Sequence, residues 1–171
     1  GFSSKGRREM PNDHVLCDGP PEQISRGGTF TGQHVYLPLR GVAVHINAYN
    51  FACWGMLENL APTLLAGVPA IVKPATSTAY LTERMFRRIV DSGLLPEGAV
   101  QLICGSTGDL FEHLNCQDVI AFTGSKGTAD YLAGHKHVVD QSVRFTAETA
   151  SLNCSILGPD ASPDTPEFDL Y

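Results

Sequence analysis

The sequence lacks the features that mark nucleic-acid binders, membrane proteins and disulfide-stabilised domains. Acidic residues outnumber basic ones by 18 to 12, for a net charge of −6, whereas proteins that bind phosphate backbones need clustered Lys and Arg. No apolar run reaches the length of a membrane span, and the first residues do not resemble a signal peptide. The five cysteines are scattered, with no CxxC pair, so we expect neither a disulfide framework nor a metal site. The expected location is the cytoplasm.

A strand–helix–strand pattern stands out in the first half of the chain. Residues 41–46 are mostly apolar, residues 54–66 form an apolar segment of helix length, and residues 69–72 form a second apolar run. Parallel strands need a crossover of this kind, so the segment predicts a βαβ unit. Ligands of parallel sheets lie beyond the carboxyl ends of the strands, where Asn50 and Lys73 fall.

The alternation of strand and helix continues to the last third of the chain. Apolar runs bounded by glycine or serine predict further strands at residues 99–104, 119–122 and 142–147. Helical spacing predicts a helix over residues 76–90 with Thr78 or Ser77 as a candidate cap, one that ends at about Leu114, and one that follows Ser125 and runs through Leu132. We therefore predict an α/β fold with a doubly wound, mostly parallel, Rossmann-like sheet.

The chain before this pattern carries turn signals and one further strand, and glycine-containing turns follow two of the later strands. Asp18–Pro21 predicts a turn, and residues 34–38 predict a strand that leads into the sheet. Gly105-x-x-Gly108 and Thr123-Gly124-Ser125 follow predicted strands, and such turns can bring backbone N–H groups close to a phosphate. A tight turn needs glycine even without a ligand, and neither turn is a GxGxxG motif.

Four short motifs, each after a predicted strand, share the order and approximate spacing of one enzyme family. They are Asn50-Phe51, Lys73-Pro74-Ala75, Phe122-Thr123-Gly124-Ser125 and Glu148. On these motifs the sequence resembles the aldehyde dehydrogenase superfamily from about Gly41 to Leu157. The stretches LICGSTGDL and AETASLNCSILG are similar to the branch that includes the dehydrogenase domain of bifunctional phenylacetate-degradation proteins. Two alternatives stay open: a dehydrogenase of benzoyl-coenzyme A oxidation, and a non-catalytic Rossmann-like scaffold.

The resemblance implies oxidation of an aldehyde, expected to be a coenzyme A-linked semialdehyde, to its acid. Asn50 would then stabilise the oxyanion, and Glu148 would be the general base. In the family the nucleophilic cysteine follows this glutamate by a few tens of residues, which is beyond Tyr171. We therefore expect the chain to be an inactive fragment of a homo-oligomeric parent. Cys53 is the one tempting substitute, but burial on a helix is the commoner fate of such a residue.

The resemblance also implies a nicotinamide cofactor. Lys73 would bind the adenosine ribose, and Ser125 would bind a pyrophosphate oxygen, with Gly124 allowing the close approach. Thr76 stands where many NAD-preferring members carry an acidic residue, so we expect NADP to be preferred and NAD to be possible.

The expected domains are a lead-in segment and strand at residues 1–40, an NAD(P)-binding α/β domain at 41–148, and the incomplete start of a catalytic domain at 149–171. We expect Cys104 and Cys154 to lie on strands in the core.

Overall fold

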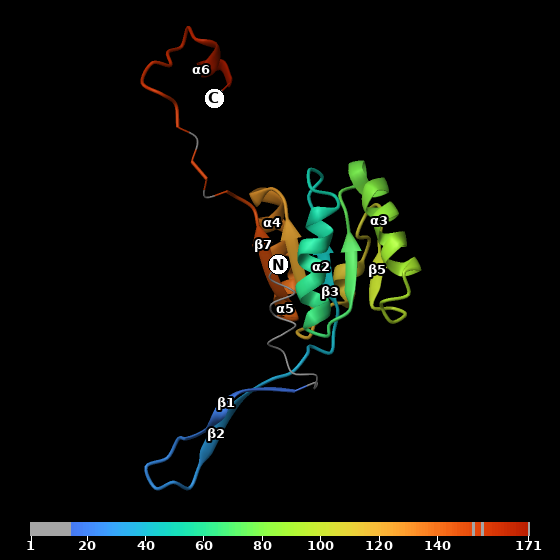
Figure 1. Ribbon diagram of the computed structural model, residues 1–171, viewed down its shortest axis with the longest axis vertical. Helices are drawn as coiled ribbons and strands as arrows, with labels where there is room; N and C mark the ends of the chain where they lie inside the picture. The colour runs from blue at the N-terminus through green and yellow to red at the C-terminus, as the bar shows by residue number, and fades with distance from the viewer. Residues whose placement is uncertain (1–14, 152, 155, 171) are drawn as a thin grey trace.

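The structure, a computed structural model, describes residues 15–151, 153–154 and 156–170. Its centre is a five-stranded sheet in the order β5-β4-β3-β6-β7, in which every neighbouring pair is parallel (Figure 1). The strands are β3 Ala43–Ile46, β4 Ala70–Lys73, β5 Val100–Leu102, β6 Val119–Thr123 and β7 Arg144–Glu148. Each lies close to its expected position, which confirms the parallel sheet.

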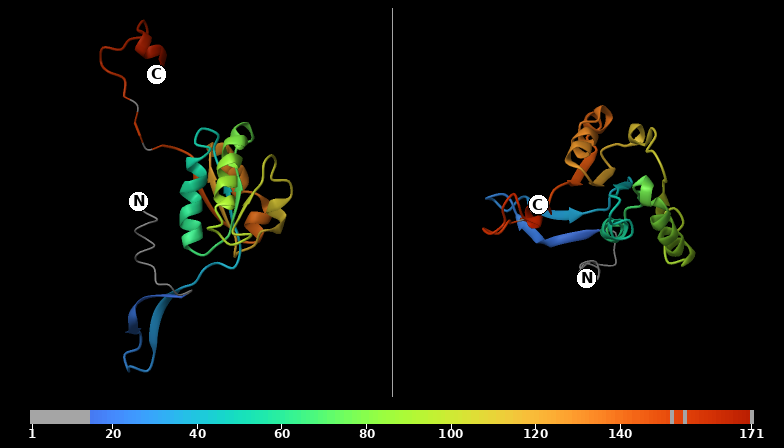
Figure 2. Two further views of the ribbon diagram at one scale, coloured as in Figure 1. Left: turned by 45° about the vertical axis from the view of Figure 1, so that its right-hand side comes forward. Right: turned by 90° about the horizontal axis from the view of Figure 1, so that it is seen from above.

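Helices cover both faces of the sheet, as the doubly wound pattern predicts. One face carries α2 Trp54–Leu65 and α3 Ala79–Asp91, and the other carries α4 Lys126–Ala133 and α5 Lys136–Asp140 (Figure 2). A short 3-10 turn, η1 Thr76–Thr78, precedes α3. The helix expected to end at Leu114 is instead a single 3-10 turn, η2 Leu110–His113. Gly108 just before it has φ +54°, outside the helical region, so a longer helix does not form there.

The core is divided between the two faces by the alternation of side chains along each strand. Val44 and Ile46 of β3 pack with residues of β6, α4 and α5. Ala70 and Val72 of β4 pack instead with Met56 of α2 and its neighbours. All four residues of β3 are buried, including His45, because this central strand is covered on both faces, and that explains why its sequence does not alternate with exposed polar residues.

A buried carboxylate fixes the start of β3 beside β6. Asp118, only 4% exposed, accepts hydrogen bonds from the backbone N–H groups of Val42 (2.7 Å) and Asn115 (2.8 Å). Gly41 lies against this carboxylate and against the carbonyl of Gln117, so closely that a Cβ there would collide with both. The connection into the central strand therefore requires glycine at position 41 for steric reasons.

A separate antiparallel hairpin precedes the sheet. It consists of β1 Leu16–Gln23 and β2 Thr31–Tyr36, and Figure 1 shows it projecting from the sheet and helices. The turn expected at Asp18–Pro21 is wrong, since these residues lie within β1. There the pairing register shifts between Asp18 and Glu22, because Pro has no N–H to donate to the ladder, and the chain is distorted without reversing.

The last element that the structure describes is a short helix, α6 Pro166–Leu170. None of the helices in the described part of the chain combines the length and apolarity needed to cross a membrane.

Candidate functional site

The predicted site residues gather at the carboxyl edge of the sheet. Lys73 is the last residue of β4, and Glu148 is the last residue of β7. Asn50 lies in the turn between β3 and α2, and Gly124 and Ser125 directly follow β6. The pairing register makes this placement firm, because β4 and β6 both end beside the end of β3 and the last residues of β6 and β7 are paired.

The order of the strands reverses at this edge. The chain passes from β3 to β4 on one side and later returns to add β6 on the other side of β3. This reversal is the topological switch point at which open parallel sheets bind ligands. The turn with Asn50 follows β3, and the turn with Gly124 and Ser125 follows β6, so the two turns flank the switch point.

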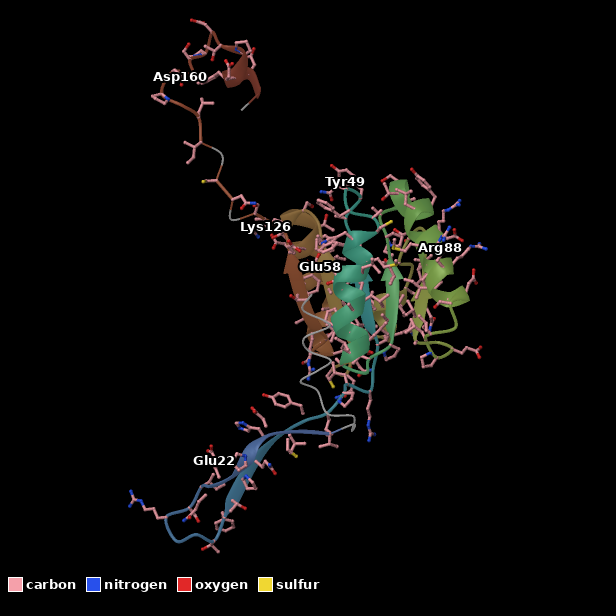
Figure 3. The ribbon with its side chains drawn as sticks, in the orientation of Figure 1. Glu22, Tyr49, Glu58, Arg88, Lys126 and Asp160 are labelled. Atoms are coloured by element: carbon pink, nitrogen blue, oxygen red, sulfur yellow. The ribbon has the colours of Figure 1, made fainter. Side chains whose placement is uncertain are left out.

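The turn that contains Asn50 is exposed at its tip. Asn50 and its neighbours Tyr49 and Phe51 are all solvent-accessible, and Figure 3 shows Tyr49 at the same end of the sheet as Lys126. Thr78 does occupy the N-cap position of α3, but its hydroxyl makes no capping bond. The hydroxyl donates instead to the carbonyl of Tyr49, at 3.2 Å. The expectation of Thr78 or Ser77 as the cap is thus confirmed for the position of Thr78 and wrong for its hydroxyl, because that side chain binds the neighbouring turn.

The end of β4 offers cationic and hydroxyl groups. Lys73 is half-buried, and its Nζ donates to the carbonyl of Pro74 at 3.2 Å. An ammonium group has three N–H donors, so donors are left for an anionic or hydroxyl-bearing ligand. Thr76, the first residue of η1, is exposed two residues beyond the buried Pro74. The chemistry of this pair fits the ribose of a nucleotide, and no acidic side chain stands at position 76.

The turn after β6 has a structural role of its own. Ser125 is the N-cap of α4, and its Oγ accepts a hydrogen bond from the backbone N–H of Thr128 at 3.3 Å. A Cβ on Gly124 would lie 2.6 Å from the ring of Phe122. Glycine is thus needed here to accommodate the ring, and it also leaves the exposed N-terminus of α4 accessible to an anion.

Glu148 lines a small cavity together with two residues that the sequence interpretation missed. The cavity has a volume of about 200 Å³ and is bounded by β6, β7 and the Glu58 and Asn59 side of α2. Figure 3 labels Glu58 on α2. Asn59 is tied to Asn47, at the end of β3, through its Nδ2, which lies 3.5 Å from the Asn47 Oδ1. The sequence does carry a signal for Glu58 and Asn59, since they are adjacent polar residues within the mostly apolar helix α2.

His45 lies below this edge and belongs to the core, as its position in an apolar strand suggests. It is 1% exposed, and its Nε2 lies 3.0 Å from the hydroxyl of Thr63 on α2. Burial disfavours the charged imidazolium and lowers the pKa of His45 to about 4. The ring is therefore neutral at physiological pH.

The thiols are placed differently from the expectation. Cys104 and Cys154 are exposed and lie outside the strands, because β5 already ends at Leu102 and β7 at Glu148. Cys53 is half-buried at the N-cap position of α2, with its Sγ 4.0 Å from the carbonyl of Leu81 on α3. Within the described ranges, no group of three or more His, Cys, Asp or Glu residues is arranged to hold a metal ion.

Comparison with known proteins gives a consistent result. Residues 21–165 match the model of the Aldehyde dehydrogenase family. A 3,4-dehydroadipyl-CoA semialdehyde dehydrogenase from Aromatoleum evansii is 50% identical over 155 residues, which are 91% of this chain and 30% of that protein. A D-glyceraldehyde dehydrogenase (NADP(+)) from Picrophilus torridus is 31% identical over 91 residues, which are 52% of this chain and 18% of that protein. The chain thus spans less than a third of the length of these relatives.

Solved structures show the same fold. Succinic semialdehyde dehydrogenase from Streptococcus pyogenes, in complex with NADP+, superposes with a TM-score of 0.64 at 18% identity, covering 86% of this chain and 30% of that chain. Betaine aldehyde dehydrogenase from Staphylococcus aureus, in complex with NAD+, gives a TM-score of 0.66 at 21% identity, covering 86% of this chain and 28% of that chain.

Proposed function

Since this chain belongs to the aldehyde dehydrogenase family, we propose that it supplies the NAD(P)-binding part of an enzyme that oxidises a coenzyme A-linked semialdehyde to its acid. The observation that carries the proposal is the meeting of Lys73, Ser125, Asn50 and Glu148 at the ends of four adjacent parallel strands. The similarity to a CoA semialdehyde dehydrogenase supports this substrate class. We propose phenylacetate degradation as the pathway, with benzoyl-coenzyme A oxidation as the alternative.

We propose NADP as the preferred cofactor. When bound, the nicotinamide of such a cofactor accepts a hydride. Lys73 would bind the hydroxyls of the adenosine ribose, and the neutral Thr76 would tolerate a 2′-phosphate that a carboxylate would repel. Ser125 and the N-terminus of α4 would bind the pyrophosphate, because N–H groups and the helix dipole favour negative charge there.

At the aldehyde side, we propose that the Asn50 amide donates to the developing oxyanion and that Glu148 accepts a proton. The cavity beside Glu148 leaves room for water next to the carboxylate. Cys53 faces α3, and the other cysteines match no nucleophile motif of the family, so we expect no dehydrogenase turnover from residues 1–171. We further propose a cytoplasmic, homo-oligomeric parent enzyme.

Titration calorimetry with NADP+ and NAD+ tests the nucleotide site. Lys73→Ala should weaken the binding of both cofactors by about tenfold or more, since hydrogen bonds to charged groups contribute about 1.5–3 kcal/mol. Thr76→Glu should weaken NADP+ binding by about tenfold more than NAD+ binding, because the new carboxylate would repel the 2′-phosphate, which only NADP+ carries.

A matched control is Lys136→Ala. Lys136 is an exposed lysine of α5 that pairs with Asp140, away from the carboxyl edge, and its removal should leave both affinities unchanged. A folded protein that binds neither cofactor would contradict the proposed nucleotide site. Equal effects of Thr76→Glu on NADP+ and NAD+ would contradict the preference for NADP.

A further inference from the structure

The turn that carries Asn50 has no side-chain cap from its own helix. Helix α2 begins at Trp54, and its N-cap residue, Cys53, provides no side-chain hydrogen bond. Helices usually begin with Ser, Thr, Asp or Asn at this position, whose side chain binds the free N–H groups of the first turn. The helix holds the turn only through backbone bonds from Gly55 to the carbonyl of Phe51 (2.8 Å) and from Leu57 to that of Cys53 (3.2 Å), so contacts with another part of the protein add to its support.

Those contacts come from the start of α3. Thr82 Oγ1 donates to the carbonyl of Ala52 at 2.9 Å, and Thr78 Oγ1 donates to the carbonyl of Tyr49 at 3.2 Å. Thr78 is the N-cap residue of α3, and Thr82 lies in its first turn. Thr82 is fully buried, with 0% exposure, so its hydrogen bond is protected from competition with water. The two acceptor carbonyls lie on either side of Asn50 and the residue that follows it.

We propose that Thr82 is a positioning residue that, assisted by Thr78, holds the backbone of Asn50 in place at the carboxyl edge. The same helix follows directly on η1, whose first residue is Thr76. The segment proposed to bind the cofactor ribose and the turn proposed to bind the oxyanion are thus joined through α3. Nucleotide binding at η1 stabilises the Asn50 turn through these two hydroxyls. This inference rests on the proposed function, which supplies the roles of Asn50 and Thr76. Its first test, below, needs only the hydrogen bond of Thr82.

Hydrogen exchange of the unliganded protein tests the hydroxyl itself. Thr82→Val keeps the shape of the side chain but removes the donor and leaves the Ala52 carbonyl unpaired. The amides of Gly55 and Leu57, which donate to the carbonyls of Phe51 and Cys53 in this turn, should then exchange roughly tenfold faster. Thr82→Ser restores the hydroxyl and should restore most of the protection. Amides of β6 serve as the internal reference, because they report on the stability of the whole sheet. Equal acceleration in β6 and at Gly55 and Leu57, or no acceleration in either, would overturn the positioning role.

Repeating the exchange with saturating NADP+ tests the coupling. The nucleotide should slow exchange at Gly55 and Leu57 in the original protein, and this slowing should be lost in Thr82→Val while the amides beside Lys73 stay protected. Equal slowing in both proteins would refute the coupling. If NADP+ binds neither protein, the proposed function and the coupling both fail, whereas the comparison without nucleotide still decides whether Thr82 positions the turn.

Discussion

Acidification is expected to destabilise the protein through the buried imidazole of His45. This ring is 1% exposed, and burial lowers its pKa from 6.5 to about 4. In the unfolded chain the imidazole has its ordinary pKa, so the unfolded state binds more protons than the folded state between pH 6.5 and 4. Stability is therefore complete above about pH 7 and falls as the pH decreases through this window.

The size of the effect follows from the shift in pKa. Each unit is equivalent to about 1.4 kcal/mol, so the full loss by pH 4 is about 3 kcal/mol. Between pH 7.5 and pH 5 the expected loss from this one group is about 2 kcal/mol. That is a large fraction of the stability of an ordinary domain, which is on the order of 5–15 kcal/mol.

Urea unfolding at pH 7.5 and pH 5 measures this contribution. His45→Gln keeps a polar side chain beside Thr63 but has no titrating group, so its stability should fall by about 2 kcal/mol less than that of the original protein over the same interval. His34→Gln is the matched control, because His34 is exposed on β2, and it should not alter the pH dependence. If the original protein and His45→Gln lose equal stability on acidification, the buried neutral imidazole is not responsible.

Two further predictions concern the stability of turns and helix ends. Gly41→Ala should destabilise the protein by about 2 kcal/mol or more, because its Cβ would collide with the carboxylate of Asp118. Gly127→Ala, in open space on α4, should instead stabilise the protein by about 0.5 kcal/mol. Equal urea midpoints for the two variants would contradict the steric argument. Ser125→Ala removes the bond from the Thr128 N–H and should cost about 1 kcal/mol, measured by the same unfolding assay, and no loss would mean that the cap contributes nothing.

The sheet and the location of the site could be predicted because both depend on local patterns. A strand buried on two faces has a mostly apolar sequence without polar alternation, as β3 does apart from His45, and a crossover helix forces the strands that it joins to be parallel. Once the strands are parallel, Lys73 and Glu148 must lie at one edge of the sheet. The hairpin could not be predicted in the same way, since the glycine and prolines of β1 have the composition of a turn.

The supports of the site could not be predicted because they depend on the packing of distant segments. Thr82 lies 30 residues from its acceptor Ala52, and nothing in the local sequence distinguishes it from a threonine exposed to solvent. Glu58 reaches the cavity of Glu148 only because α2 lies across the face of the sheet next to β6 and β7. In the same way, Cys104 is exposed because β5 is shorter than its apolar run.

The central position of β3 affects how the chain folds. This strand is the first of the sheet in the chain, yet the bond that fixes its start comes from Asp118, 76 residues later. During synthesis β3 can pair with β4 early, but its other edge stays open until β6 has emerged. Contacts between such distant segments slow folding, and an open edge on an apolar strand can pair with another chain. Productive folding therefore requires β6 to reach β3 before a second copy of the protein does.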